Sequence, residues 1–227
     1  MLEGAYMKHK LDGFTLKLIA IAAMTVDHIA VIFFPTELWM RLIGRLTMPI
    51  MAFFIAEGYK YTRSVKRYVS RILLFAAISQ IPFMLAFNST SFNVMFTLTI
   101  AILIVLIEQS RLPKHLRLLL SLSLLCLSIF CDWPLFGVLY VLVFFRYRGN
   151  FKRQAIAFTF TVLVQLFSYS LTSIASKDYS FIVEAGTLGA LPLLSLYSGK
   201  KGEGPRYLFY IFYPAHLAVL ALLGYLI

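Results

Sequence analysis

Long apolar runs alternate with short polar connections along the whole chain. A helix needs about 20 apolar residues to cross roughly 30 Å of hydrocarbon. By this measure the pattern predicts nine membrane-spanning helices, over residues 14–34, 38–60, 67–87, 93–109, 115–131, 134–146, 153–174, 181–198 and 207–226. Two of these, 115–131 and 134–146, are short and are separated only by "CDWP". They form either a helical hairpin or one broken segment, and the second alternative would reverse the direction of every later span.

The composition supports a membrane protein. Of the 227 residues, 60 % are hydrophobic and only 14 % are charged, and the mean hydropathy is +0.83. A soluble domain of this size does not need so much apolar surface. We therefore expect an all-α, polytopic bundle of about nine helices in the lipid bilayer, with residues 1–227 as a single domain. The first apolar run is too long for a cleavable signal peptide, so we expect it to remain as a membrane helix.

The charge pattern predicts an orientation. A net charge of +11 would suggest a nucleic-acid partner in a soluble protein, but here the position of the charges explains it better. Seventeen of the 21 basic residues lie in alternate connections: Lys8, Lys10, Lys17, Arg63, Lys66, Arg67, Arg71, Arg111, Lys114, Arg117, Arg146, Arg148, Lys152, Arg153, Lys200, Lys201 and Arg206. The connections between them contain only Lys177. The positive-inside rule then predicts a cytoplasmic N-terminus and an extracytoplasmic C-terminus, and no nucleic-acid partner is expected.

Four polar side chains share one depth in the first two predicted spans. Asp27 and His28 lie in the outer half of the first span, within "MTVDHIAVIFFP". Arg41 and Arg45 come early in the second span and are four residues apart, hence on one helix face. An unpaired charge near the middle of the bilayer costs about 2.5–3.5 kcal/mol. We therefore expect these groups to meet around a polar cavity, with Asp27 holding one arginine. Alternatively, the arginines reach the outer headgroups and Asp27 only fixes helix packing.

Two further charged or titratable groups lie inside predicted spans. His216 follows Pro214 about halfway along the last span, which makes a second polar site at a similar depth. A proline frees backbone carbonyls, and these are tolerated only where protein or water satisfies them. Glu57 lies near the inner end of the second span, and Lys60, three residues on, could neutralise it.

The remaining intramembrane polar residues have simpler explanations. Gln80 lies in the middle of the third span, and Asn93 begins the fourth, where it either caps the helix or serves the site. Gln165 is expected to hydrogen-bond between helices. Asp132 and Glu184 fall at outer helix ends, where we expect interfacial solvation.

Known chemical motifs are missing from the sequence. There is no HExxH, P-loop, GxSxG or glycine-rich nucleotide motif. No metal is predicted, because His28 and His216 lack further ligands and Cys126 and Cys131 have no metal-binding spacing, so both cysteines are expected in the core. Besides an enzyme, a proton-coupled transporter and a non-catalytic membrane assembly factor stay open. Against a transporter, the sequence has neither paired broken helices nor repeated halves.

Several polar motifs, in order, resemble the TraX family. They are "DH" in the first span, "GRLTMPIMAFFIAEGY" in the second, "R.LLFA.ISQIPF" in the third, "NVMFTL" in the fourth and "FYPAHL" in the last. The resemblance covers residues 14–100 and 207–220. The founding members of this family are conjugation-associated bacterial membrane proteins needed for N-terminal acetylation of pilin. The family also looks distantly similar to multi-span acyltransferases with a catalytic histidine in an early helix, including the lysosomal heparan acetyltransferase.

The resemblance implies acetyl transfer from cytosolic acetyl-CoA to an amine, in the bacterial inner membrane. The acceptor would be a peptide or pilin N-terminus, or another extracytoplasmic group. His28 would act as general base on the attacking amine, or as a nucleophile through an acetyl-imidazole. An arginine or Asn93 would stabilise the tetrahedral oxyanion. His216 would be a second acid or base, or a substrate anchor.

Basic residues at the inner mouth would bind the CoA phosphates. They cluster in "TRSVKRYVSR" and comprise Arg63, Lys66, Arg67 and Arg71. The positive-inside rule explains the same charges without any ligand.

Overall fold

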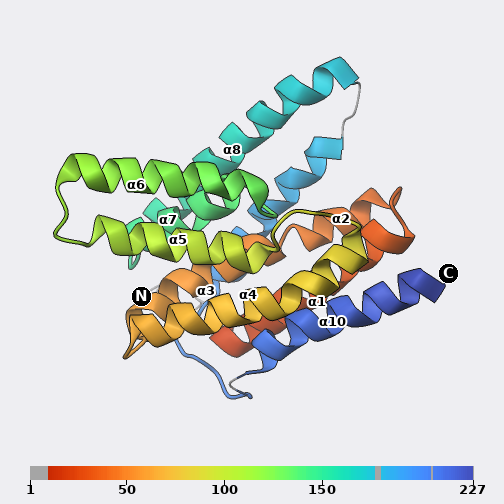
Figure 1. Ribbon diagram of the computed structural model, residues 1–227, viewed down its shortest axis with the longest axis horizontal. Helices are drawn as coiled ribbons and strands as arrows, with labels where there is room; N and C mark the ends of the chain where they lie inside the picture. The colour runs from red at the N-terminus through yellow and green to blue at the C-terminus, as the bar shows by residue number, and fades with distance from the viewer. Residues whose placement is uncertain (1–9, 177–179, 206, 227) are drawn as a thin grey trace, which may run out of the picture.

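The computed structural model describes residues 10–176, 180–205 and 207–226, and these residues form helices and connections without a β-strand (Figure 1). The α-helices are α1 (Gly13–Phe33), α2 (Leu38–Gly44), α3 (Thr47–Tyr61), α4 (Val65–Phe87), α5 (Val94–Glu108), α6 (Lys114–Leu127), α7 (Phe136–Arg146), α8 (Phe151–Ser176), α9 (Ala190–Ser195) and α10 (Leu208–Leu226). Two 3₁₀ helices are η1 (Ser128–Phe130) and η2 (Ser180–Gly189). The all-helical class predicted from the apolar runs is confirmed.

Five helical segments are long and apolar enough to cross a membrane. They are α1, the combined segment Leu38–Tyr61, α4, Phe151–Leu171 in α8, and α10. Helices α5 and α7 and the segment Phe181–Ser195 are apolar but shorter. These helices support the prediction of a membrane protein. The count of nine crossings and the orientation of the termini stay predictions.

A stripe of small residues makes α1 the central helix of the site. The Asp12 side chain caps its first turn by accepting a hydrogen bond from the Thr15 amide at 2.8 Å. The buried positions follow helical spacing and are Gly13, Leu16, Ala20, Ala23, Met24, Asp27 and Ala30. Because four of these seven residues are glycine or alanine, neighbouring helices approach closely, and Asp27 falls on the same buried face.

The predicted second span is interrupted. Helix α2 ends at Gly44 and α3 begins at Thr47, so Arg45 lies at the break between them. Pro49 lies in the first turn of α3, where an amide would have no intrahelical partner in any case. The break places Arg45 at a buried turn rather than on a continuous helix.

Residues 115–146 form a hairpin and not one broken span. The start of α6 lies beside the end of α5, where Arg117 donates to the Glu108 carbonyl at 2.7 Å. Helix α7 starts beside the start of α5, because Gly137 packs against Thr97. Helices α6 and α7 therefore run antiparallel. Helix α6 buries none of its side chains. Cys126 is accordingly exposed, contrary to expectation, while Cys131 is buried as expected.

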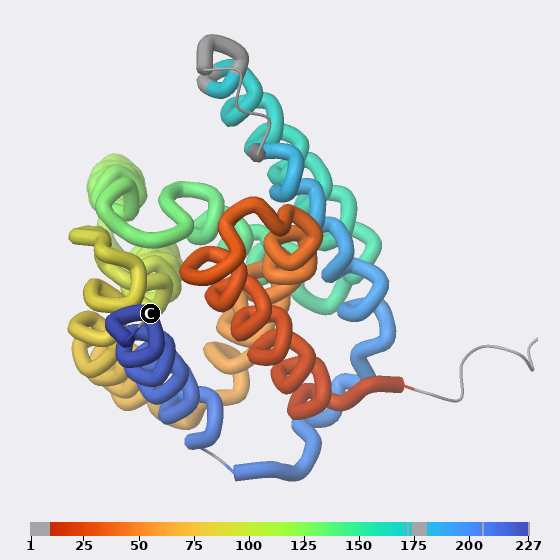
Figure 2. The backbone as a smooth tube through the Cα atoms, turned by 90° about the vertical axis from the view of Figure 1, so that its right-hand side faces the viewer, coloured from red at the N-terminus to blue at the C-terminus, as the bar shows by residue number. Residues whose placement is uncertain are grey.

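The C-terminal helix returns to pack beside the first one. Phe209 contacts Phe14 with ring centroids 5.6 Å apart, and Gly224 lies against Ile32. Helices α1 and α10 therefore run in the same direction, and α10 also packs along α4 (Figure 2). This arrangement brings the middle of α10 to the outer half of α1.

Candidate functional site

Two histidines from opposite ends of the chain form a hydrogen-bonded pair. Nδ1 of His28 lies 2.8 Å from Nε2 of His216, and the two rings stack at 5.0 Å. Nδ1 of His216 lies 2.9 Å from the carbonyl oxygen of Phe212. The sequence placed both residues at one depth, and the structure brings them into direct contact.

The partners of this pair assign its proton positions. A carbonyl oxygen only accepts, so Nδ1 of His216 carries the proton and its Nε2 is an acceptor. Nδ1 of His28 must then donate to His216, which leaves Nε2 of neutral His28 with a free lone pair. Aromatic rings enclose the pair: Phe87 contacts His28 edge-on, and Phe212 stacks on His216.

A cavity of about 910 Å³ connects His28 with a basic mouth. Asp27, His28, Asp132 and Trp133 line it at the outer depth, and its wall includes apolar side chains such as Met24, Met51, Ile55 and Leu98. At the other end it is lined by Lys17, Arg63, Arg67, Arg71 and Lys201. Lys17 and His28 are eleven residues apart on α1, a rise of about 16 Å. The cavity therefore extends through roughly half of the membrane thickness.

Aromatic rings hold two cations at the basic mouth. Arg71 lies over the ring of Tyr210 at 5.2 Å, and Lys17 lies 4.8 Å from the centroid of the Phe54 ring. Three of the four predicted mouth residues, Arg63, Arg67 and Arg71, line the cavity, whereas Lys66 does not.

Lys17 and Lys201 also line the large cavity, although the sequence did not single them out as binding residues. The only signal for them was their membership of the basic connections, which did not distinguish them from other cations in those connections.

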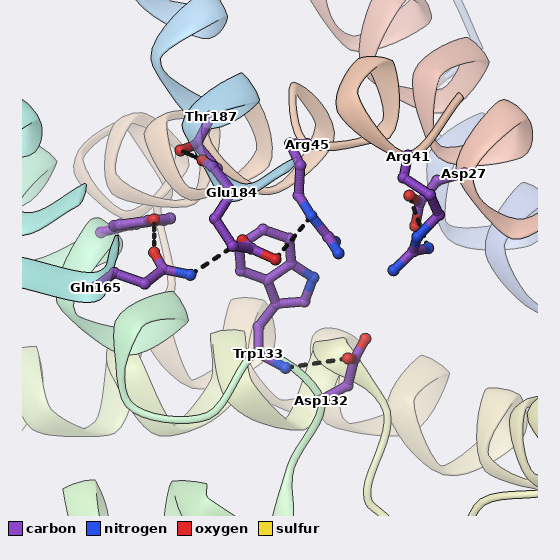
Figure 3. A network of polar contacts seen from close by, with 9 residues as sticks. Asp27, Arg41, Arg45, Asp132, Trp133, Gln165, Glu184 and Thr187 are labelled. Atoms are coloured by element: carbon purple, nitrogen blue, oxygen red, sulfur yellow. Dashed lines mark hydrogen bonds and ion pairs between the residues drawn. The ribbon is translucent and has the colours of Figure 1, made fainter. Parts of the chain in front are cut away.

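Ion pairs compensate the charges around the outer end of the cavity (Figure 3). Asp27 pairs with Arg41 at 2.8 Å, and Arg45 pairs with Glu184 at 2.9 Å. The guanidinium of Arg45 also lies 5.0 Å from the indole centroid of Trp133. The sequence expectation that Asp27 holds one of the two arginines is thus met by Arg41. Arg45 is buried beside Glu184 and does not extend to the headgroups.

A hydrogen-bonded chain supports the pair of Arg45 and Glu184. Gln165 donates from Nε2 to Glu184 at 3.0 Å and accepts a hydrogen bond from the Tyr140 hydroxyl. This interhelical contact of Gln165 was expected. The expected interfacial solvation of Glu184 was wrong, because η2 packs against α2 and buries the carboxylate. The expected interfacial position of Asp132 also differs from the structure, in which Asp132 lines the large cavity.

Gly44 allows the pair of Asp27 and Arg41 to form. A Cβ atom at Gly44 would lie only 2.2 Å from the Cβ of Asp27. Helix α2 therefore crosses α1 at a distance that only glycine permits. Arg41 and Arg45, on the other side of this contact, line an outer cavity of about 350 Å³ together with Glu184.

Three other predicted site residues have structural partners. Glu57 pairs with Arg148 at 2.7 Å and not with Lys60, because the end of α7 lies beside α3. Asn93 caps α5. Its amide nitrogen donates to the Ala76 carbonyl at 2.8 Å and to Gln80 at 2.9 Å. Both amide hydrogens of Asn93 are thereby used, which leaves no donor for an oxyanion.

Gln80 completes this contact between α4 and α5. Its Nε2 donates to the Ser91 carbonyl at 2.8 Å. Gln80 and Asn93 therefore join two helices and the connection between them, and neither side chain lines the large cavity.

A helical bundle with a histidine pair at the end of an internal cavity defines a membrane protein with a buried polar site. The chain belongs to the TraX family, because the family model described as TraX protein matches residues 12–224. This family is a bacterial membrane family with pilus-associated members, and the resemblance given by the polar motifs is confirmed.

Two relatives extend this comparison. The chain is 36 % identical over 230 residues to a probable fimbrial assembly protein FimC, serogroup H1, of Dichelobacter nodosus, covering 92 % of this chain and 94 % of that protein. It is 41 % identical over 66 residues to an uncharacterized protein, RP591, of Rickettsia prowazekii, covering 29 % of this chain and 25 % of the relative. No solved structure matches the chain.

Proposed function

We propose that this protein is a membrane-embedded acetyltransferase that moves an acetyl group from cytosolic acetyl-CoA to an amine on the outer side. The observation that carries the proposal is the cavity of about 910 Å³, which joins a basic mouth to His28. Its volume is at the upper end of the range for small-molecule sites.

The lining of the cavity fits the parts of acetyl-CoA in order. Arg63, Arg67 and Arg71 would bind the phosphates, because guanidinium groups form paired, charge-assisted hydrogen bonds with them. The uncharged pantetheine arm would follow the less polar middle section towards His28. The thioester would then meet the imidazole at the depth where an outer-side amine arrives.

His28 acts as the general base in this proposal. The amine nitrogen attacks the thioester carbonyl while Nε2 of His28 takes the amine proton. The tetrahedral intermediate collapses, the carbon–sulfur bond breaks, and the imidazolium returns the proton to the departing thiolate. An amide and free CoA thiol result, and His28 is neutral again. Such a base contributes about 10²–10⁴ in rate.

His216 positions the base. Its Nε2 accepts a hydrogen bond from Nδ1–H of His28, and its own Nδ1–H donates to the Phe212 carbonyl. This contact selects the tautomer with a free Nε2 and would stabilise the imidazolium that forms during transfer. A nucleophilic role of His28 predicts an acetyl-enzyme, which acid-quenching with radiolabelled acetyl-CoA in the absence of acceptor would trap.

The relative named as a fimbrial assembly protein supports an acceptor on the outer side. Fimbrial subunits are exported proteins, and their N-termini become accessible beyond the cytoplasmic membrane. By analogy, the amine would belong to a peptide or pilin N-terminus.

The test uses the purified protein in nanodiscs with radiolabelled acetyl-CoA and a peptide that has a free N-terminus. Wild type is expected to acetylate the peptide, and His28→Ala is expected to lose at least 100-fold in rate. His115→Ala is the matched control, because His115 is exposed at the start of α6. Undiminished transfer by His28→Ala would overturn the assignment of the base. Saturable CoA binding without transfer would favour a non-catalytic role, and no CoA binding would favour transport.

A further inference from the structure

Three carboxylates line the large cavity, and one of them lacks a cationic partner. Asp27 pairs with Arg41 and Glu57 pairs with Arg148. Among the described residues, no lysine, arginine or histidine forms an ion pair with Asp132 within 4.0 Å. Because an uncompensated carboxylate at membrane depth is costly, its presence at the end of a cavity requires an explanation.

The backbone around Asp132 is fixed by hydrogen bonds. Its amide donates to the Phe92 carbonyl at 2.6 Å, and its carbonyl accepts a hydrogen bond from the Thr97 hydroxyl. One carboxylate oxygen accepts from the Trp133 amide at 3.1 Å. The backbone of Asp132 is therefore tied to the beginning of α5, and the Trp133 amide holds one oxygen of its carboxylate.

The same connection contains two strained residues. Trp133 has φ of 56° and Leu135 has φ of 55°, a region that residues with a Cβ atom rarely adopt. Such conformations cost about 1–3 kcal/mol each and are concentrated at binding and catalytic sites. Asp132 and Trp133 both line the cavity, and in Figure 3 the indole of Trp133 points towards Arg45 while the Asp132 side chain extends away from it.

The outer end of the cavity has one more acidic group than basic groups. The acidic groups are Asp27, Asp132 and Glu184, and the basic groups are Arg41 and Arg45. The electrostatic neighbours of Asp132 are Arg45, Asp27 and Arg41. Both arginines already have acidic partners. A cation bound beside Asp132 would therefore balance the charge at this end of the cavity.

We infer that Asp132 binds the ammonium group of the acceptor before transfer. The inference rests on the proposed function, which requires an amine to reach His28. An α-amino group has a pKa of about 7.7–8.0 and so arrives protonated at neutral pH. It must release one proton to water from this site before its nitrogen has a lone pair to attack the thioester, and His28 then takes the second proton during the attack. Arg41 and Arg45 lie within electrostatic range of both Asp132 and His28, which places the carboxylate and the imidazole at the same end of the cavity. The ligand class is a primary ammonium with an apolar body.

A binding experiment tests the site without requiring transfer. The chain contains two tryptophans, Trp39 and Trp133, so Trp39→Phe leaves Trp133 as a single fluorescent reporter beside Asp132. Titration of this protein in nanodiscs with hexylammonium chloride is expected to give a saturable fluorescence change. Hexanol, which has the same chain without the charge, is expected to give none. Asp132→Asn in the same background is expected to weaken the binding of hexylammonium at least tenfold.

Glu37→Gln is the matched control, because Glu37 is an exposed acid outside the cavity, and its affinity is expected to stay within twofold. A second measurement on the wild type covers the case in which Asp132→Asn does not fold. Dicyclohexylcarbodiimide, which reacts with unpaired intramembrane carboxyls, is expected to label Asp132 in preference to Asp27 and Glu57, and hexylammonium is expected to protect it.

The outcomes separate the inference from the proposed function. Binding without acetyl transfer would overturn the function and leave the ammonium site standing. Acetyl transfer with an unchanged acceptor KM in Asp132→Asn would overturn the site and leave the function. Equal responses to hexylammonium and hexanol, or labelling of Asp132 that hexylammonium does not reduce, would also overturn the site.

Discussion

Individual proton positions decide what the histidine pair can do. His216 is buried behind His28 and is not part of the cavity wall. It therefore affects chemistry only through the hydrogen bond at 2.8 Å. This distinguishes a positioning residue from one that touches the substrate.

Removing His216 should slow transfer without weakening donor binding. For His216→Phe we expect a decrease in kcat of about 10- to 100-fold, part of the full contribution of the base, with the KM for acetyl-CoA within twofold. The pH dependence of kcat should shift as well, because the imidazolium of His28 loses its acceptor. Steady-state kinetics between pH 6 and 9 measures both effects. A decrease in activity with an unchanged pH profile would indicate a structural role only.

The buried pair of Arg45 and Glu184 gives a stability prediction. Both side chains are 11 % exposed, so Glu184→Gln leaves a guanidinium without its counter-ion. We expect a loss of about 3–5 kcal/mol in the free energy of unfolding, as for other buried pairs that lose one partner. Arg45→Met should cost a similar amount, and the double variant less than the sum. Denaturant unfolding in detergent micelles measures this cycle, and additive costs would contradict coupling.

At this scale the sequence predicted residues that pair within adjacent helices. Asp27 and the two arginines lie on neighbouring elements at one depth, so the sequence predicted that Asp27 holds one of them, and the structure shows that it is Arg41. Glu184 and Asp132 were mistaken for interfacial residues, because their burial depends on how η2 and the connection before α7 fold. Neither a 3₁₀ helix nor a strained turn has a periodic hydrophobic pattern to reveal it.

Helix crossings, rather than single side chains, set the width of the site. Helix α1 presents alanines along its buried face, and α2 approaches through Gly44. The break between α2 and α3 then turns Arg45 towards η2. The sequence predicted one continuous span here, since hydropathy does not detect a two-residue interruption in an apolar run.

A methyl group at the crossing should disrupt the site. Gly44→Ala places Cβ within 2.4 Å of three Asp27 atoms, so the helices must separate or Asp27 must leave Arg41. We expect a destabilisation of about 1–3 kcal/mol, typical of overpacking. Gly224→Ala is the matched control, because its Cβ would meet Ile32 at an ordinary 3.4 Å. Thermal unfolding of both variants in the same detergent makes the comparison, and equal stability would contradict the crossing argument.

The direction of the chain through the bilayer belongs to the whole molecule. Lys201 lines the basic mouth, and Glu37 lies in the connection after α1, between Pro35 and Leu38, which line the outer cavity. The basic connections favour a cytoplasmic position for the mouth. Much of the bundle could be predicted from the sequence, because apolar length and charge alternation act along the whole chain. The packing order of the helices could not, since no local pattern records that α10 returns to α1 and α4.

Accessibility of two introduced cysteines tests this orientation. In a background without Cys126 and Cys131, Glu37→Cys is expected to react with a membrane-impermeant maleimide in intact spheroplasts. Lys201→Cys is expected to react only after the membrane is opened. The reverse pattern would place the basic mouth outside and remove access of the cavity to cytosolic acetyl-CoA.

The pairing of α1 with α10 also has a consequence for biosynthesis. His28 is synthesised early and His216 late, with most of the chain between them. The hydrogen bond between the two histidines therefore cannot form until α10 has inserted. A nascent protein would hold its base without the hydrogen bond that selects the working tautomer. In the proposed acetyltransferase, transfer would therefore begin only after α10 has packed beside α1.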